Sequence, residues 1–170
     1  VLVTSGGSED AYMIGKIAVC EIQNLIVAYK ERLDKNNFIQ NLLLDNLLLV
    51  DIYNQAKKLK IPVLQRRVVF LVETKNADSS LVLETLKGIF SIGARDFATS
   101  VEEGHIILVK ALEPTEDYKA IQHMADVIVD TLGMEVMVGV RVSYGTSVEE
   151  LKDVSRSYKE ADMDQEVGRI

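Results

Sequence analysis

The feature that most constrains the fold is a change of hydrophobic period at Pro62. Before it, from Tyr12 to about Leu48, apolar residues recur three and four positions apart, which predicts helix. The stripe consists of Ile14, Ala18, Ile22, Leu25 and Tyr29, continued by Ile39, Leu42, Leu43 and Leu47. After Pro62, the run RRVVFLVE (66–73) is continuously apolar at its centre, as in a strand buried on both faces. The chain therefore divides into a helical segment, 12–62, and a mixed segment, 63–170.

Within the helical segment, the Asn36-Asn37 pair is expected to bend or break the helix. Asp51 is a plausible N-cap for a short helix, IYNQAKKL, which ends at Lys60-Ile61-Pro62. The narrow apolar stripe from Tyr12 fits either a dimer seam or an ordinary amphipathic helix lying on a sheet. Too few clean heptads are present to choose between these two interpretations.

The mixed segment begins with the strand 66–73, followed by a helix, SSLVLETLKGIF (79–90), with one apolar face. The runs RDFATSV (95–101) and HIILVKAL (105–112) flank the loop Glu102-Glu103-Gly104, which predicts a hairpin. Pro114-Thr115 opens a second helix, which Gly133 is expected to end as the C′ residue. The buried faces of these two helices are expected to contain Val82, Leu86, Ile89 and Phe90, and Ile121, Met124, Ala125, Ile128 and Leu132.

The last elements are a strand and a closing helix. EVMVGVRVS (135–143) alternates strictly, with Val136, Val138, Val140 and Val142 on one side, which suits an edge strand. Ser147 and Glu150 have the spacing of a capping box that opens the closing helix. Its buried stripe is expected to be Leu151, Val154, Tyr158 and Ala161.

The predicted order β-α-β-β-α-β-α defines an α+β fold (an α/β sandwich) of the ferredoxin-like βαββαβ type. It carries an extra C-terminal helix and an N-terminal helical extension. The first and third strands, which are the most continuously apolar, belong in the middle of the sheet. The closing helix and the N-terminal helices are expected to cover the second face.

Composition excludes several classes of protein. The 170 residues carry a net charge of −7, which argues against a nucleic-acid-binding face on this segment. The longest apolar run, Leu42–Val50, is broken by Asp45-Asn46, so no membrane span is expected. Cys20 is the single cysteine, which excludes a disulfide framework and indicates a cytoplasmic protein.

The candidate catalytic residues are few, and each has a plain structural alternative. His105 and His123 have no second imidazole or thiol at ligand spacing, and Cys20 is most simply a small core residue. Glu102 and Glu103 could hold a cation, but carboxylates on a turn are more often solvated. Glu73 is expected to be an exposed carboxylate at a strand end. No glycine-rich phosphate loop and no Ser-His-Asp set with a nucleophile elbow is present in the sequence.

The C-terminal run VSYGTSVEELKDVSRSYKEADMDQEVGRI resembles the end of the GGDEF-like middle domain of PucR/CdaR-type (sugar diacid regulator-like) bacterial transcription regulators. The matching positions are Gly145, Ser147, Glu149, Glu150, Leu151, Ser157, Tyr158, Glu160, Ala161, Val167 and Gly168. Asp162-Met163 departs from the family, which usually has an Ala-Leu-like pair there. Upstream, residues 36–61 and the strand 66–73 are similar to the linker helices and first strand of the same family.

In true GGDEF cyclases, two glycines in the hairpin let the backbone approach a triphosphate, and an acid holds a metal. The matching hairpin here is Ser100-Val101-Glu102-Glu103-Gly104, in which Ser and Val replace the glycines. The segment after the first strand is reduced to Glu73-Thr74-Lys75-Asn76. The resemblance therefore implies a degenerate domain that is not an enzyme, with no catalytic, cofactor-binding or metal-binding residues.

The resemblance also implies a role. Residues 1–11 are similar to the tail of an upstream sensor domain, residues 12–62 to a linker for dimerisation and signalling, and residues 63–170 to the GGDEF-like domain. Such a module would form a homodimer and bind neither cofactor nor membrane. It would couple an effector-binding sensor to a C-terminal helix-turn-helix, through which alone DNA is bound. The alternative is a divergent nucleotide-binding or nucleotide-processing domain that uses Glu73, Glu102 and Glu103 with a divalent metal.

Overall fold

A computed structural model describes the backbone of residues 3, 5–75, 77–90, 95–137 and 139–167, and the side chains of these residues as far as Met163. The chain forms two compact units, Val1–Asn37 and Phe38–Ile170. The first unit contains most of the long helix α1 (Glu9–Leu43), and the second contains its last turns and every later element.

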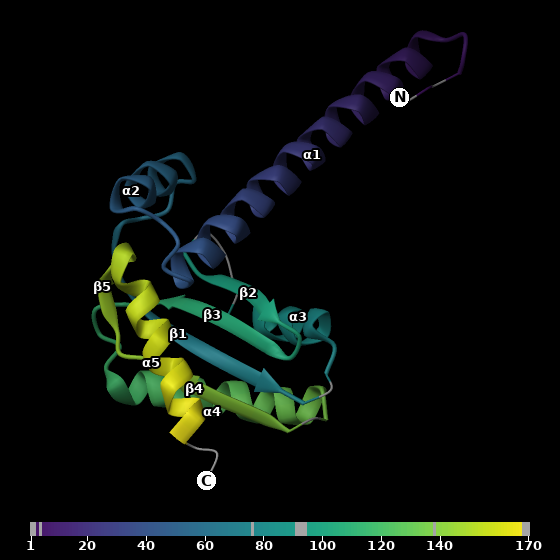
Figure 1. The fold of residues 1–170 in the computed structure, drawn as a ribbon. Helices are drawn as coiled ribbons and strands as arrows, with labels where there is room; N and C mark the ends of the chain where they lie inside the picture. The colour runs from purple at the N-terminus through teal and green to yellow at the C-terminus, as the bar shows by residue number, and fades with distance from the viewer. Residues whose placement is uncertain (1–2, 4, 76, 91–94, 138, 168–170) are drawn as a thin grey trace. The chain divides into compact units, whose positions relative to one another are not determined.

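The second unit has the predicted order of elements with one addition (Figure 1). The helix α2 (Leu49–Lys58) and the strand β1 (Leu64–Thr74) are followed by α3 (Ser79–Phe90). The hairpin strands β2 (Phe97–Glu102) and β3 (His105–Ala111) precede α4 (Tyr118–Glu135) and β4 (Val140–Tyr144). The addition is a short strand, β5 (Val148–Glu150), which runs into a 3₁₀ turn, η1 (Leu151–Asp153), and then α5 (Val154–Val167).

The sheet has the strand order β2-β3-β1-β4, and all of its pairs are antiparallel. β1 and β3 therefore occupy the middle and β4 an edge, as the hydrophobic patterns predict. β1 is long enough to pair with β4 along its second half and with β5 along its first half. This topology confirms the α+β, ferredoxin-like fold.

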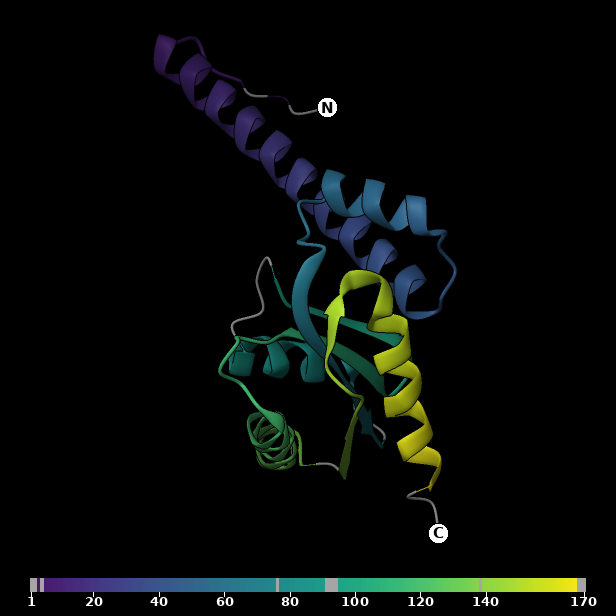
Figure 2. The same cartoon turned by 90° about the vertical axis from the view of Figure 1, so that its left-hand side faces the viewer.

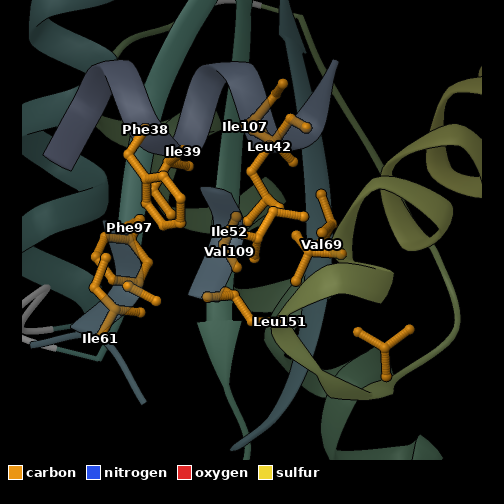
Figure 3. Packing of buried hydrophobic residues seen from close by; sticks show 14 of the residues in the cluster. Phe38, Ile39, Leu42, Ile52, Ile61, Val69, Phe97, Ile107, Val109 and Leu151 are labelled. Atoms are coloured by element: carbon orange, nitrogen blue, oxygen red, sulfur yellow. The ribbon is translucent and has the colours of Figure 1, made fainter. Parts of the chain in front are cut away.

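Two hydrophobic cores lie on the two faces of the sheet. Alternate β1 side chains, Val68, Phe70 and Val72, join the core beneath α3 and α4. Val69 and Leu71 join the opposite core, which α5, α2 and the last turns of α1 cover (Figure 2). Figure 3 shows side chains from α1, α2, η1 and the sheet meeting in this second core. The N-terminal helical segment thus contributes to the second face from Phe38 onward, as expected.

Several sequence-based boundaries are wrong. α1 runs through the Asn36-Asn37 pair without a break. α2 begins before Asp51, and its N-cap residue, Leu48, makes no side-chain capping bond. α4 continues through Gly133 to Glu135, and Asp117 is its N-cap, because the Asp117 side chain accepts a hydrogen bond from the Ala120 amide.

The closing helix also begins later than predicted. Ser147 and Glu150 form no capping box: Ser147 precedes β5, Glu150 ends β5, and α5 begins only at Val154. The predicted buried stripe is confirmed nonetheless, since Leu151, Val154 and Ala161 are fully buried and Tyr158 packs against them. The predicted fourth strand is shorter than expected, and its Val138 lies outside the described residues, as do Asn76 and Gly168.

Candidate functional site

The sequence-predicted site residues Glu73 and His105 meet where β1 ends and β3 begins. They are register partners, and His105 Nε2 lies 4.0 Å from Glu73 Oε1. On the other side of β1, the register partner of Glu73 is Arg141 of β4. The Glu73 side chain is only 16% exposed, so the expectation of an exposed strand-end carboxylate is wrong. Its position in the middle of the sheet accounts for this burial.

The β2–β3 turn closes onto the end of β1 through backbone hydrogen bonds. The Gly104 carbonyl accepts hydrogen bonds from the Thr74 amide, at 2.8 Å, and from the Thr74 hydroxyl, at 3.5 Å. The Gly104 amide donates to Ser79 Oγ at 3.4 Å. Gly104 has φ +80, and a Cβ there would lie 2.7 Å from the Thr74 carbonyl oxygen. This glycine therefore lets the hairpin turn approach the end of β1, and the polar backbone groups of Gly104 are used within the domain.

A small cavity lies beside this closed turn. Its volume is about 190 Å³, and Glu73, Lys75 and Arg141 are among its lining residues. Pockets for small molecules and cofactors usually measure about 300–1,000 Å³. This cavity is therefore smaller than the usual range for such pockets.

The two hairpin acids are not gathered into a ligand set. Glu102 and Glu103 are both exposed. Among the described residues, no group of three or more His, Cys, Asp or Glu side chains is placed to hold a metal ion. The structure thus brings Glu73 and His105 together and leaves the hairpin carboxylates in solvent.

The remaining sequence candidates lie elsewhere on the surface. His123 is exposed on α4. Cys20 is exposed on α1, so its interpretation as a small core residue is wrong. The residues 11–29 are apolar around much of the helix, and periodicity alone could not show that this segment lies outside the core.

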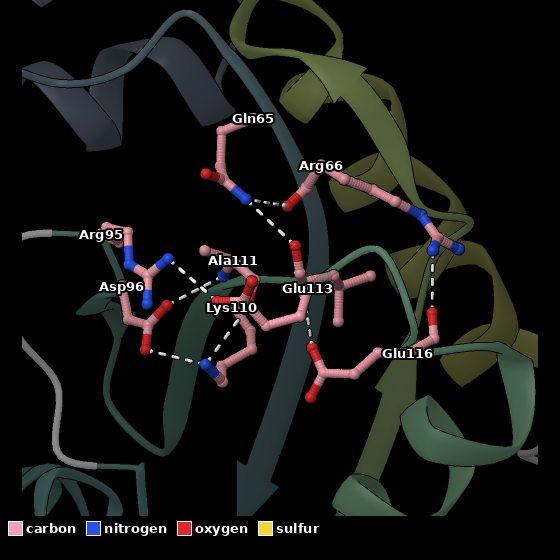
Figure 4. A network of polar contacts seen from close by, with 9 residues as sticks. Gln65, Arg66, Arg95, Asp96, Lys110, Ala111, Glu113 and Glu116 are labelled. Atoms are coloured by element: carbon pink, nitrogen blue, oxygen red, sulfur yellow. Dashed lines mark hydrogen bonds and ion pairs between the residues drawn. The ribbon is translucent and has the colours of Figure 1, made fainter.

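A polar network that the sequence did not reveal fixes the start of β2 against the end of β3 (Figure 4). Asp96 accepts hydrogen bonds from Lys110 Nζ, at 2.9 Å, and from the Ala111 amide, at 2.8 Å. Nearby, the fully buried Arg67 donates to the Pro62 carbonyl at 2.6 Å. Burial lowers the pKa of Arg67 to about 10, against the opposing attraction of Asp96. These charges have structural partners, which indicates a role in stability.

The exposed apolar surface of α1 is the most prominent feature of the first unit. Large side chains exposed along it include Tyr12, Met13, Ile14, Ile17, Val19, Ile22, Leu25, Ile26, Val27, Tyr29 and Leu33. By length and composition alone, this helix is long and apolar enough to cross a membrane, a possibility that the expectation of no span did not include. Unbroken apolar runs do not reveal this segment, because Lys16 and Glu21 interrupt it. The same test is passed by signal sequences near an N-terminus, so this is weak support for a span.

Within α1, residues 12–33 contain a heptad pattern. Tyr12, Val19, Ile26 and Leu33 lie seven residues apart, and Ile22 and Tyr29 follow at the complementary position. In a parallel pair of such helices, the flanking positions would place Ala11 opposite Lys16, Ala18 opposite Gln23, Leu25 opposite Lys30, and Arg32 opposite Asn37. None of these four pairs places two like charges opposite each other. The seam is compatible with a second copy of the chain.

The strand order, the two-sided helical cover and the closed hairpin define an α+β domain of the ferredoxin-like class. Compared with known families, residues 46–163 match the GGDEF-like domain. Since the match covers well over half of the chain, the chain belongs to the GGDEF-like domain family. No curated protein matches the chain. The predicted GGDEF-like domain is thereby confirmed.

Proposed function

We propose that this chain is a non-catalytic signalling and dimerisation module of a cytoplasmic bacterial transcription regulator. It couples an effector-binding domain on its N-terminal side to a DNA-binding helix-turn-helix on its C-terminal side. The regulator context rests on the resemblance of residues 142–170 to PucR/CdaR-type proteins. The family match concerns the GGDEF-like domain itself.

The closed hairpin is the observation that carries the non-catalytic part of the proposal. A cyclase-like hairpin must offer free backbone amides and space to a triphosphate. Here the Gly104 carbonyl is bonded to Thr74, its amide to Ser79, and the neighbouring cavity measures about 190 Å³. These bonds use both polar backbone groups of Gly104 within the domain, which supports a hairpin that stabilises the sheet and does not bind phosphate.

Calorimetry with GTP or ATP and Mg²⁺ tests this part directly. We expect no binding heat from the full chain. Micromolar binding that Glu102→Ala abolishes, and that Glu84→Ala on the exposed face of α3 leaves intact, would support the alternative of a nucleotide-processing domain.

The heptad of α1 supports the dimerisation part. A long helix that joins two copies can transmit a rotation or a change of register from one domain to the next. Burying an unpaired charge costs several kcal/mol. We therefore expect Ile26→Glu, in the seam, to raise the dimer dissociation constant by about 100-fold or more.

The matched control is Asn24→Glu, which adds the same charge at the outer position of the heptad. Light scattering after size exclusion should give a dimer for the wild type and Asn24→Glu, and a monomer for Ile26→Glu. Circular dichroism checks that α1 remains helical. A wild-type monomer that sediments with phosphatidylcholine–phosphatidylglycerol vesicles would instead identify α1 as a membrane-binding helix and reject the dimer.

A further inference from the structure

A second and larger cavity lies at the opposite end of the sheet from the hairpin. Its volume is about 510 Å³, within the usual range of ligand pockets. It is bounded by the start of β1, the start of α4, the end of β4 and the side of α5. Its lining residues include Arg66, Tyr118, Tyr144, Ser147, Glu160 and Met163.

The loop between β4 and β5, which lines this cavity, is fixed from two sides. The Gly145 amide donates to the Val69 carbonyl of β1 at 3.1 Å. The Thr146 amide and hydroxyl both donate to Glu160 Oε2 of α5, at 2.7 and 2.5 Å. A Cβ at Gly145 would lie 1.9 Å from the Ser157 carbonyl oxygen, so the loop is packed directly against α5. The cavity is therefore preformed, and a ligand need not order the loop.

Arg66 is held in place with hydrogen-bonding capacity to spare. Its Nη1 donates to the Glu116 carbonyl at 2.8 Å, and its Nε and Nη2 donate to Ser147 Oγ at 3.3 and 3.1 Å (Figure 4 shows the first of these bonds). A guanidinium has five N–H donors, so these bonds leave two available. The acidic partner, Glu149, is 79% exposed and 3.8 Å away, which makes it a weak competitor for an incoming anion. Since Ser147 Oγ accepts from Arg66, its hydroxyl hydrogen can also donate to a ligand.

The rest of the cavity wall includes two tyrosine rings, tilted by 58° to each other, and one carboxylate. The rings of Tyr118 and Tyr144 lie 6.1 Å apart, and their hydroxyls are 3.2 Å from each other. Ile121 and Met163 add apolar surface. The hydrogen bonds from Thr146 lower the pKa of Glu160, which therefore presents a negative charge at neutral pH. A second negative charge on the ligand would be repelled by it.

We propose that this cavity binds a small organic monoanion, namely a single carboxylate carried on a flat apolar ring. The carboxylate pairs with Arg66 and Ser147, and the ring packs against Tyr118, Tyr144 and Met163. The chain as a whole carries a net charge of −7, so anions are not attracted to it in general. The site is independent of the proposed signalling role and lies away from the hairpin.

Benzoate is the probe, titrated into the full chain and followed by amide chemical shifts. A ligand of about nine non-hydrogen atoms is expected to bind with a dissociation constant of about 1 mM. The shifts should concentrate at residues 118–121 and 144–147. Benzamide, which has the same shape without the charge, should bind about tenfold more weakly or worse, because a charge-assisted hydrogen bond is worth about 1.5–3 kcal/mol. Terephthalate should also bind more weakly than benzoate, because Glu160 repels its second carboxylate.

Arg66→Gln should weaken benzoate at least about tenfold for the same reason, while Arg95→Gln, an exposed arginine paired with Glu113, should have no effect. Tyr118→Ala and Met163→Ala serve if Arg66→Gln fails to fold, because both side chains are about two-thirds exposed, at 66% and 64%. Each substitution should raise the dissociation constant of benzoate severalfold. Equal binding of benzoate and benzamide, shifts outside these residues, or no shifts at all would overturn the proposal.

Discussion

The two ends of the sheet each depend on a glycine pressed against a backbone carbonyl, but with opposite results. At the hairpin end, Gly104 joins the turn to Thr74 of β1 and leaves a neighbouring cavity of about 190 Å³. At the other end, Gly145 joins the β4–β5 loop to Val69 and packs it on Ser157 of α5, beside a cavity of about 510 Å³.

The difference lies in which neighbours use the polar groups. At the hairpin, the amide and the carbonyl of the glycine are both satisfied within the turn region, by Ser79 and Thr74. At the β4–β5 loop, the amides of Gly145 and Thr146 are bonded within the domain, and the side chains of Arg66 and Ser147 line a space large enough for a ligand. The domain thus uses the polar groups of Gly104 internally at one end of the sheet and presents an organised polar surface at the other.

The largest expected loss of stability comes from adding a side chain at Gly145, where the β4–β5 loop packs against α5. In Gly145→Ala, the added Cβ would lie 1.9 Å from the Ser157 backbone oxygen, which cannot move without shifting α5. We expect a loss of about 4 kcal/mol or more in the free energy of unfolding, which approaches the whole stability of a small domain. Urea unfolding followed by circular dichroism measures it.

Gly88→Ala is the control, because a Cβ at that position of α3 meets nothing within 4 Å. Replacing a helical glycine should add about 0.5–1 kcal/mol of stability. A Gly145→Ala domain as stable as wild type would show that the loop is not packed on α5.

The corresponding change at the hairpin, Gly104→Ala, should cost less. The residue would have to adopt φ +80 with a Cβ 2.7 Å from the Thr74 oxygen, but the turn can move away from the strand end. We expect a loss of about 3 kcal/mol from the left-handed conformation and the displaced hydrogen bonds. Thermal unfolding checks this, and a loss equal to that of Gly145→Ala would remove the contrast between the two ends.

Much of the fold follows from local pattern. Three short-range signals are confirmed by the structure: the apolar run of β1, the apolar face of α3 and the Gly-containing hairpin loop. The central position of β1 and β3 also follows, since strands buried on both faces are apolar throughout. The stripe Leu151, Val154 and Ala161 was correct even though the start of its helix was not.

The errors arise where distant partners compete with a local motif. Ser147 has the spacing of an N-cap, but Arg66, 81 positions earlier in the chain, donates to its hydroxyl instead. The residues after Ser147 pair with β1 and form β5, through the pairs Leu64–Glu150 and Arg67–Val148. No pattern within residues 145–161 contains either partner. For the same reason, the cavity beside this loop could not be predicted.

Ser157, one of the positions that carry the family resemblance, also has a structural role. The end of β4 leaves the Val69 amide of β1 to be satisfied elsewhere, and Ser157 Oγ of α5 accepts its hydrogen bond at 3.2 Å. Ser157→Ala leaves this buried amide without that partner, so we expect a loss of about 1–3 kcal/mol. Denaturant unfolding measures the difference.

Ser155→Ala, at a buried position of the same helix, is the matched control. It should cost less than Ser157→Ala, because no hydrogen bond of its hydroxyl is found among the described residues. Equal losses would mean that the Val69 amide is satisfied without Ser157.

The smallest effect is the pH dependence of the bond between Glu160 and Thr146. The two hydrogen bonds from Thr146 hold the pKa of Glu160 below its usual value of 4.5. Because the folded pKa of Glu160 is lower than the unfolded one, the bond stabilises the domain fully above about pH 5, and its contribution is lost as pH falls through the folded pKa.

Glu160→Gln removes the part of this stabilisation that depends on the charge of Glu160. The melting temperatures of wild type and Glu160→Gln should therefore differ most at pH 7 and converge toward about pH 3. Glu84→Gln, at an exposed carboxylate of α3, controls for the general effect of removing one negative charge. A difference in melting temperature between wild type and Glu160→Gln that stays constant from pH 7 to pH 3 would show that the charged carboxylate does not fix the β4–β5 loop. Other contacts would then have to position this loop beside the larger cavity.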